Sequence, residues 1–557
     1  MIYDFSKVDA LPPSRYDLCI IGSGPAGATI ANVLADSDYK ICILESGRYK
    51  PEKFTDELRE VDHEGISIKS YSRERVIGGA STTWSGLSSP LDAIDFKQRE
   101  WVPYSGWPID PEALSPYYIE ASRQFRFPLR ERFKDLDWMA LGTTIGQVPH
   151  WQELEEKIFI APDPPQNYGK EFQAIYDRPN VDLYTGCTVT HLDGCAETGR
   201  VHTAIVRSFD GRKTTFTAKI FVLACGGIEN PRILLNSTFA CATGLGNDRD
   251  QVGRYFMNHP KNNYGVIHLN RPIQDLPGYF GFLSLKIQCA GYIGLRLKET
   301  VQQQQAILNS YIRFEPVFGW SGRESIESLN YFSKRSQFLL KGFKRLKQGK
   351  LLSLRDYSET GDDSDLMNER KNASKILQMI GTIALDFPVV IDYLKSRFFD
   401  SHSPKINTIH LRNFMEMAPS PENRVALSDR IDAFGLRLPH VSHKPSELDK
   451  RSMASVHHTL AKELDRTGWG KLVSELRPDL EPWPIDLDAS HHMGATRMGD
   501  DPSSSVVNQQ CRLHFSPNVY LAGASTFPTS GNANPTFTIV ALAIRLAEHL
   551  KRELFHS

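Results

Sequence analysis

The sequence has almost no excess of charge of either sign. Lys and Arg number 65 and Asp and Glu number 66, so the 557-residue chain carries a formal net charge of −1. Such a balance offers no overall attraction to nucleic acid or to an anionic membrane. We therefore expect no nucleic-acid partner, and any partner bound by charge must contact a local patch.

The sequence also lacks the cysteine and hydrophobic patterns of several protein classes. None of the eight cysteines forms a C-x-x-C pair, which excludes a dithiol redox motif and favours small buried thiols in a reducing compartment. No apolar run reaches the roughly 18 residues of a membrane span, and residues 1–15 have no apolar signal core. We predict a cytoplasmic protein, with a peripheral membrane contact as the alternative. The adjacent pairs His457-His458 and His491-His492 have no Cys or Asp at ligand spacing, so we expect no metal.

A nucleotide-binding fingerprint stands near the start of the chain. Residues 16–21 read as a buried strand, the turn Gly22-Ser23-Gly24-Pro25-Ala26-Gly27 follows, and a helical pattern comes next. Gly22 permits the turn, Gly24 lets the backbone approach a pyrophosphate, and Gly27 allows close packing of helix on strand. A second strand ends at Glu45, whose carboxylate is placed to accept hydrogen bonds from a ribose. A glycine turn alone also suits an ordinary strand–helix unit, but the added acidic residue favours an adenosine dinucleotide.

The pattern along the chain predicts an α/β fold with an inserted second unit. Strand–turn–helix patterns occur at about 16–46, 181–236 and 518–551, and in the second of these the Asn230-Pro231 pair predicts a helix start. Between about 262 and 443, strand-like pieces such as 291–297 and 408–415 indicate an antiparallel sheet. We predict a discontinuous Rossmann-like nucleotide domain at 1–120, 176–260 and 485–557, and a substrate domain at 121–175 and 261–484.

Residues of about 320–400 form an insertion that is helical and partly basic. Residues 334–347 mix bulky apolar and basic side chains, and a second helical run follows at 376–394. One interpretation is a helical hairpin that covers the entrance of the site. The other is a basic amphipathic surface at 334–347 that docks to lipid or to a partner.

The most specific motifs lie in the C-terminal part, at 490–499, 518–525 and 531–536. Together with the fingerprint, and with 76–86, 106–108 and 421–425 in the same order, they resemble the glucose-methanol-choline (GMC) flavin oxidoreductases over nearly the whole chain. The loop at 81–84 and the stretch at 533–536 are most similar to the pyranose 2-oxidase and sugar dehydrogenase branch. The resemblance implies a Rossmann-like FAD-binding domain with an antiparallel substrate domain.

The resemblance also implies which residues bind FAD. In the pyranose oxidase pattern a histidine that tethers the flavin covalently stands where this chain has Thr83, so we expect noncovalent FAD. Ser85 stands where that pattern has a hydroxyl near flavin N5 and O4, although an ordinary loop serine is the alternative, and Trp84 is either a cofactor neighbour or simple packing. The expected FAD-binding residues are Gly22, Gly24, Gly27, Glu45, Gly78, Gly79, Ser81, Thr83, Trp84, Ser85, Ala224, Gly523, Ala524, Asn534, Pro535 and Thr536.

Two residues match the active-site pair of that family. His491 corresponds to its histidine base and Asn534 to its second active-site residue, with His492 as the alternative base. A neutral imidazole takes the proton of an alcohol while hydride leaves for flavin N5. The resemblance thus implies an FAD-dependent oxidation of a secondary alcohol of a sugar, glycoside or polyol, with O2 or a quinone or protein as electron acceptor. The alternative is a non-catalytic or membrane-associated flavin-binding interaction protein.

Overall fold

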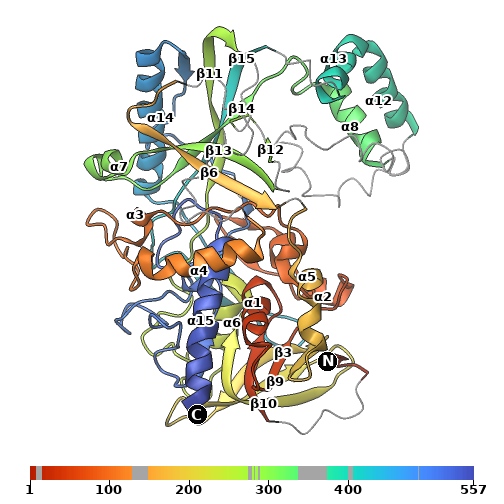
Figure 1. Ribbon diagram of the computed structural model, residues 1–557, viewed down its shortest axis with the longest axis vertical. Coiled ribbons are helices and arrows are strands. Elements are labelled where there is room, and N and C mark those ends of the chain that lie inside the picture. Colours follow the sequence, from red (N-terminus) through yellow and green to blue (C-terminus); the bar gives the residue numbers. More distant parts are fainter. Residues whose placement is uncertain are drawn as a thin grey trace.

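The computed structural model has two sheet-based parts, one toward each end of its long axis (Figure 1). It describes residues 1–7, 15–127, 149–162, 164–273, 279–280, 283–285, 289–335, 373–398, 405–486 and 488–556. Both chain ends lie in the lower part of the view in Figure 1, so segments from the two ends of the sequence belong to the same part of the fold.

A sheet of eight strands forms the lower part. Its order is β1-β7-β3-β2-β10-β9-β8, and β20 also pairs with β10. The strands from β1 to β10, and the pair β10–β20, run parallel, whereas β8, β9 and the first half of β10 are antiparallel. Strands β2 and β3 are apolar and buried almost throughout, as central parallel strands require. The bounds are β1 (Ile2–Asp4), β2 (Tyr16–Ile21), β3 (Ile41–Leu44), β7 (Val181–Thr185), β8 (Thr188–Gly194), β9 (Val201–Arg207), β10 (Lys213–Leu223) and β20 (Val519–Leu521).

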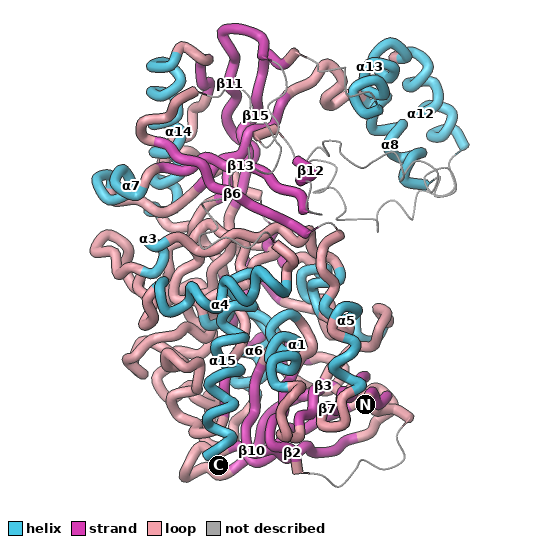
Figure 2. The backbone as a smooth tube through the Cα atoms, in the orientation of Figure 1, coloured by secondary structure: helices cyan, strands magenta, loops and turns pink. Residues whose placement is uncertain are grey.

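Helices from both ends of the chain cover this sheet (Figure 2). The fingerprint helix α1 (Pro25–Leu34) packs against the C-terminal helix α15 (Thr536–His556), and α4 (Pro111–Gln124) packs on α15. Helix α6 (Gly226–Asn236) packs against β8. The shorter helices are α2 (Lys53–Glu57), α3 (Ala93–Phe96) and α5 (Tyr168–Glu171), with 3-10 turns η1 (Ser70–Arg73), η2 (Gly79–Thr82), η4 (Gln173–Asp177) and η6 (Ala524–Thr526).

The upper part is built on a sheet of seven strands. The order is β12-β13-β14-β15-β11-β18, β6 pairs with β13, and every pair is antiparallel. Helix α14 (Glu447–Thr467) packs against β18. The predicted α/β fold class and the predicted antiparallel sheet are therefore confirmed. The bounds are β6 (Leu154–Pro162), β11 (Lys261–Ile273), β12 (Leu283–Leu285), β13 (Cys289–Leu297), β14 (Tyr311–Pro316), β15 (Ile406–Phe414), β18 (Gly470–Val473) and α7 (Glu299–Gln305).

Two small sheets connect distant segments. Strands β16 (Arg424–Ile431) and β17 (Arg437–Ser442) pair with β4 (Asp62–Glu64), and β19 (Asp488–Ala489) pairs with β5 (Ser67–Ile68). Residues 62–68 therefore pair with strands from both sides of the predicted boundary at 485. The domain limits stay a prediction.

The insertion contains three described helices, α8 (Glu324–Arg335), α12 (Ala373–Leu385) and α13 (Phe387–Phe398) (Figure 1). The predicted helical run at 376–394 is helical but is divided into two helices, because the chain bends by 80° between α12 and α13. Pro388, at the second position of α13, has no N–H to continue the preceding helix. Of the predicted basic surface at 334–347, residues 336–347 lie outside the described residues.

Helix α6 begins earlier than predicted. It starts at Gly226, which has a φ of +86°, so the chain turns directly from β10 into the helix. The side-chain oxygen of Asn230 accepts the Cys225 N–H at 2.8 Å from inside the helix. Pro231 is therefore an interior residue, and the predicted start at Asn230 is wrong.

Candidate active site

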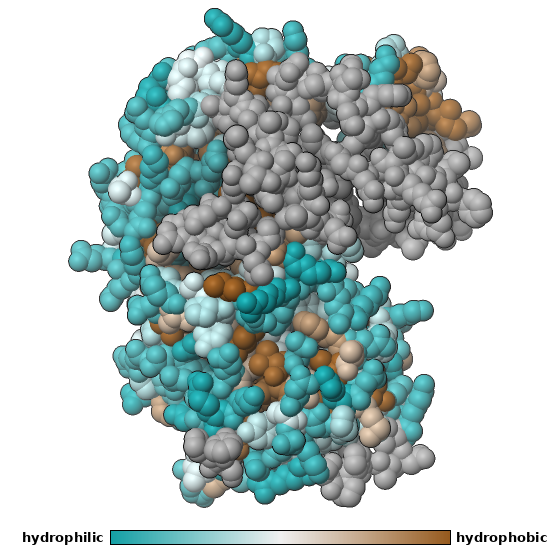
Figure 3. Space-filling model, in the orientation of Figure 1, coloured by the Kyte–Doolittle hydropathy of each residue, from teal (hydrophilic) through white to brown (hydrophobic). Residues whose placement is uncertain are grey.

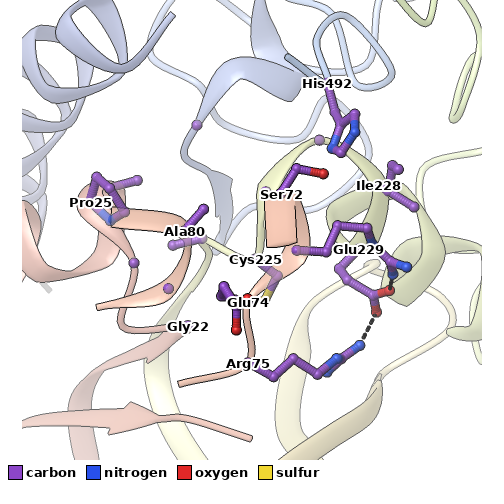
Figure 4. Close-up of a pocket in the computed structure, with 18 of the residues that line it drawn as sticks. Gly22, Pro25, Ser72, Glu74, Arg75, Ala80, Cys225, Ile228, Glu229 and His492 are labelled. Carbon is purple, nitrogen blue, oxygen red and sulfur yellow. Dashed lines mark hydrogen bonds and ion pairs between the residues drawn. The ribbon is translucent and has the colours of Figure 1, made fainter. Parts of the chain in front are cut away.

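A cavity of about 930 Å³ opens at the carboxyl ends of four parallel strands. Gly22, Glu45, Ala224 and Ala522, which directly follow β2, β3, β10 and β20, all line it. This edge is where open α/β sheets bind their ligands. Figure 4 shows Gly22 and Cys225 in this pocket, just beyond the ends of the neighbouring strands β2 and β10. The cavity continues along residues 71–75, 79–85, 187–190 and 490–492 to 534–536.

The three fingerprint glycines have different surroundings. A Cβ on Gly22 would lie 2.6 Å from the Ala224 carbonyl oxygen, and its φ of +100° disfavours other residues. A Cβ on Gly27 would lie 2.0 Å from the Gly22 carbonyl oxygen, so Gly27 brings helix and strand together without lining the cavity. A Cβ on Gly24 would meet nothing within 4 Å, because the cavity lies in front of it. Helix α1 has no side-chain cap and no acidic residue in its first turn, which leaves its N–H groups for an anion.

Glu45 is held by the fingerprint turn itself. Its Oε2 accepts the N–H and the hydroxyl of Ser23 at 3.0 and 2.7 Å, and its Oε1 accepts the Gly47 N–H at 2.8 Å. Oε1 also accepts the Ser46 hydroxyl at 3.3 Å, so both lone pairs of each oxygen have protein partners, and a ribose contact stays a prediction. Ser23 was missed from the sequence although it stands between two fingerprint glycines. Its hydroxyl also accepts the Gly78 N–H at 3.3 Å and so joins the turn to the loop at 76–86.

The loop at 78–85 forms one wall of the cavity. The Ser81 hydroxyl donates to the Gly78 carbonyl at 2.6 Å and accepts the Tyr168 N–H at 3.1 Å, so it shapes the loop. Thr83 donates to the Tyr71 carbonyl at 2.9 Å, and the Trp84 indole donates to the Gln166 carbonyl at 2.6 Å. Gly79, Ser81, Thr83, Trp84 and Ser85 line the cavity, whereas Gly78 does not.

A buried ion cluster that the sequence did not predict lies in the opposite wall. Glu229 binds Arg75 at 3.0 Å (Figure 4) and Arg232 at 3.4 Å, and it also contacts Arg73. Burial by itself raises the pKa of Glu229, but the three guanidinium groups outweigh burial and lower the pKa to about 2. Glu229 therefore stays ionised and keeps the arginine side chains in place beside the cavity.

His491 lines the cavity and contacts a second histidine. Its Nδ1 lies 2.9 Å from Nδ1 of His259, with the two rings almost perpendicular. Burial, with further contributions from His259, Lys261 and His492, lowers the pKa of His491 well below the ordinary 6.5. The ring is thus a neutral imidazole at neutral pH, the form that a base requires. The sequence did not identify His259, whose motif Asn258-His259-Pro260 carries no recognised signal.

Asn534 lines the same cavity two residues before α15 begins. Its Nδ2 donates to the Leu87 carbonyl at 3.0 Å, which leaves its second N–H and its oxygen for a ligand. Pro535 and Thr536 line the cavity beside it, and the Pro535 carbonyl accepts the Ile539 N–H at 2.9 Å to open the helix. Gly523 and Ala524 also line the cavity, and a Cβ on Gly523 would meet nothing within 4 Å.

The other histidines differ from His491. His492 also lines the cavity, and its ring stacks on Phe256 with centroids 6.0 Å apart. Both ring nitrogens of His457 are engaged, with Ser474 at 2.7 Å and Asn413 at 2.9 Å, so His457 is a packing residue. Across the described ranges, no group of three or more His, Cys, Asp and Glu side chains is arranged to hold a metal ion.

The residues that are present fit a dinucleotide. The cavity in front of Gly24 would be filled by any side chain there, and the turn, the α1 N-terminus and Glu45 are in the order that a bound pyrophosphate and ribose need. The second end of the same cavity carries His491 and Asn534. One elongated ligand in this cavity could therefore contact the fingerprint turn, His491 and Asn534 at the same time.

Comparisons with known proteins bear on the identity of this site. The family model described as GMC oxidoreductase matches residues 419–543. Paromamine 6'-oxidase of Streptomyces fradiae is 32% identical over 97% of this chain and 92% of its own length. The fructose dehydrogenase large subunit of Gluconobacter japonicus is 25% identical over 62% of this chain, and the match spans 49% of that protein.

A solved structure shows the same overall fold. Formate oxidase of Aspergillus oryzae, determined in a study of FAD modification, superposes with a TM-score of 0.51 over 98% of this chain and 99% of its own. Its sequence is 15% identical, so the likeness concerns the fold alone.

Two of the three fingerprint glycines, Gly24 and Gly27, provide a matched pair of variants. We expect Gly24→Ala to keep the fold but to lose bound flavin, because its methyl group would enter only the cavity. Gly27→Ala should lower the thermal unfolding midpoint as well, because its methyl group overlaps the Gly22 carbonyl. Flavin absorbance per protein and thermal unfolding check both. A Gly24→Ala protein with full flavin content would contradict the placement of the cofactor.

Proposed function

Because the chain belongs to the GMC oxidoreductase family, we propose that it oxidises an alcohol group of a sugar, glycoside or polyol, with noncovalent FAD as hydride acceptor. The observation that carries the proposal is the shared cavity, which joins the fingerprint turn to His491 and Asn534. The named relatives act on paromamine and fructose, which supports a sugar-like substrate. We further propose that the group oxidised is a secondary alcohol.

The chain supplies the base and the positioning groups. His491 is neutral and faces the cavity, so its free ring nitrogen accepts the alcohol proton as the carbonyl forms. Asn534 presents an amide that holds the alcohol oxygen without competing for its proton. FAD, when bound, supplies the electrophilic N5 that accepts the hydride. Thr83 has no nucleophilic ring nitrogen, which supports noncovalent binding.

Anaerobic addition of sugars, glycosides and polyols to the purified holoenzyme tests the proposed reaction. We expect one substrate class to bleach the flavin band, because hydride transfer reduces the cofactor. Readmitted air then identifies the acceptor: rapid reoxidation indicates O2, and slow reoxidation indicates a quinone or protein. A flavin that no alcohol bleaches would contradict the proposal and favour a non-catalytic flavin-binding protein.

The neighbouring histidines provide the control for the base. With the substrate that bleaches the flavin, His491→Gln should slow flavin reduction by about 10²-fold or more, as expected for loss of a general base. His492→Gln should have a much smaller effect, because its ring stacks on Phe256. Stopped-flow absorbance measures both rates. A larger loss in His492→Gln would assign the base to His492.

A membrane contact is a second proposal, carried by the surface of the insertion. Leu377, Ile380, Leu385 and Phe387 are 51–89% exposed on α12 and α13, where Figure 3 shows an apolar patch. Within the described ranges no single helix could span a membrane, but this bent pair has the required length and composition. A bent apolar pair suits helices that lie in the bilayer interface, so we propose lipid as the occupant of this patch.

Liposome flotation tests the lipid contact. The double variant Leu385→Ser, Phe387→Ser should float less than the wild type, because it removes two exposed apolar side chains from the patch. Ile431→Ser is the control, since Ile431 is 63% exposed on β16, outside the insertion. Equal flotation of all three proteins, or none by the wild type, would rule out this contact.

A further inference from the structure

His259 is a buried residue that contacts His491. It follows Asn258 and precedes β11, and its side chain is 6% exposed. One ring nitrogen, Nδ1, lies 2.9 Å from Nδ1 of His491, and the other, Nε2, lies 3.3 Å from the carbonyl oxygen of Ser530. His259 thus links the candidate base to the loop that leads to Asn534.

The partners of His259 determine where the protons are. The Ser530 carbonyl only accepts, so Nε2 of His259 carries a hydrogen. Burial lowers the pKa of His259 to about 4, although the backbone of Ser530 and Gly531 and the charge of Glu416 oppose this effect. The ring is therefore neutral with one N–H, and its Nδ1 is an acceptor. The hydrogen between the two rings consequently belongs to Nδ1 of His491.

We propose that His259 is a positioning residue that fixes His491 in the tautomer with a free Nε2 lone pair toward the cavity. The inference rests on the proposed function, because it concerns the base of that reaction. The proton of the alcohol moves to Nε2 as its hydride leaves for the cofactor, and Nδ1 keeps its hydrogen throughout. Once His491 is charged, its hydrogen bond to His259 becomes charge-assisted and stabilises the imidazolium.

The anchor of His259 is itself rigid. The Ser530 side chain accepts the Met417 N–H at 3.0 Å, and Thr529 donates to the Asp95 carbonyl at 2.7 Å. Ser530 and Thr529 are both fully buried. The loop therefore cannot follow a movement of the His259 ring without breaking buried hydrogen bonds. His259 and Asn534 share this loop as a common support.

The tautomer can be measured without a substrate. In holoenzyme labelled with ¹⁵N-histidine, the imidazole resonances that disappear in His491→Gln belong to His491. We expect a protonated Nδ1 and an unprotonated Nε2 in the wild type. In His259→Leu, which removes the acceptor, the two nitrogens should shift toward a mixture of tautomers. His259→Asn places an oxygen near the position of Nδ1 and should restore the wild-type pattern.

The same variants separate a positioning role from simple loss of structure. Flavin reduction should fall by about 10²-fold in His259→Leu and recover most of that loss in His259→Asn. A wild-type spectrum with a protonated Nε2, or a His259→Leu protein with the wild-type tautomer, would overturn the inference. If His259→Leu fails to fold, the wild-type and His259→Asn spectra still show whether Nδ1 of His491 carries the hydrogen. If no alcohol bleaches the flavin, the proposed function fails, while the nitrogen shifts still report the tautomer.

Discussion

The pairing of β10 with β2 along one edge and with β20 along the other is the contact on which the site depends. It places the fingerprint turn and the C-terminal motifs at the same end of one sheet. Asn518 secures it: its amide accepts the Val201 N–H at 3.0 Å and donates to the Val201 and Lys219 carbonyls at 2.8 and 2.9 Å. Without this alignment, the C-terminal motifs would not line the cavity together with the fingerprint turn.

Burial is the second constraint, because polar groups beside a dry cavity must find partners inside the protein. The loop before Asn534 meets this need through the upper part. Asn532 donates to Asn309 at 2.9 Å, and the Asn309 N–H donates to Glu416 at 2.6 Å. Glu416 in turn forms a buried bidentate pair with Arg99 at 2.9 and 2.5 Å. The two parts of the fold therefore meet at the loop that leads to the proposed reaction centre.

The local signals in the sequence predicted the strand–turn–helix unit of β2 and α1 well. The roles of Gly22 and Gly27 follow from turn and packing requirements that a short motif specifies, and the strands around them are continuous apolar runs. The signals were weaker where tertiary contacts decide. Asn230 resembles a helix start but lies inside α6, where its side chain accepts the Cys225 N–H, and the apolar run at 376–394 conceals the break before Pro388. His259 could not be found because its partner lies 232 residues away.

We infer that one cofactor extends from the fingerprint turn to His491. A crystal structure of the holoenzyme tests it most directly. We expect the pyrophosphate at Gly24 and the reactive edge of the flavin ring facing both His491 Nε2 and Asn534. A flavin whose ring lies nearer to His492, or whose pyrophosphate does not contact the fingerprint turn, would contradict it.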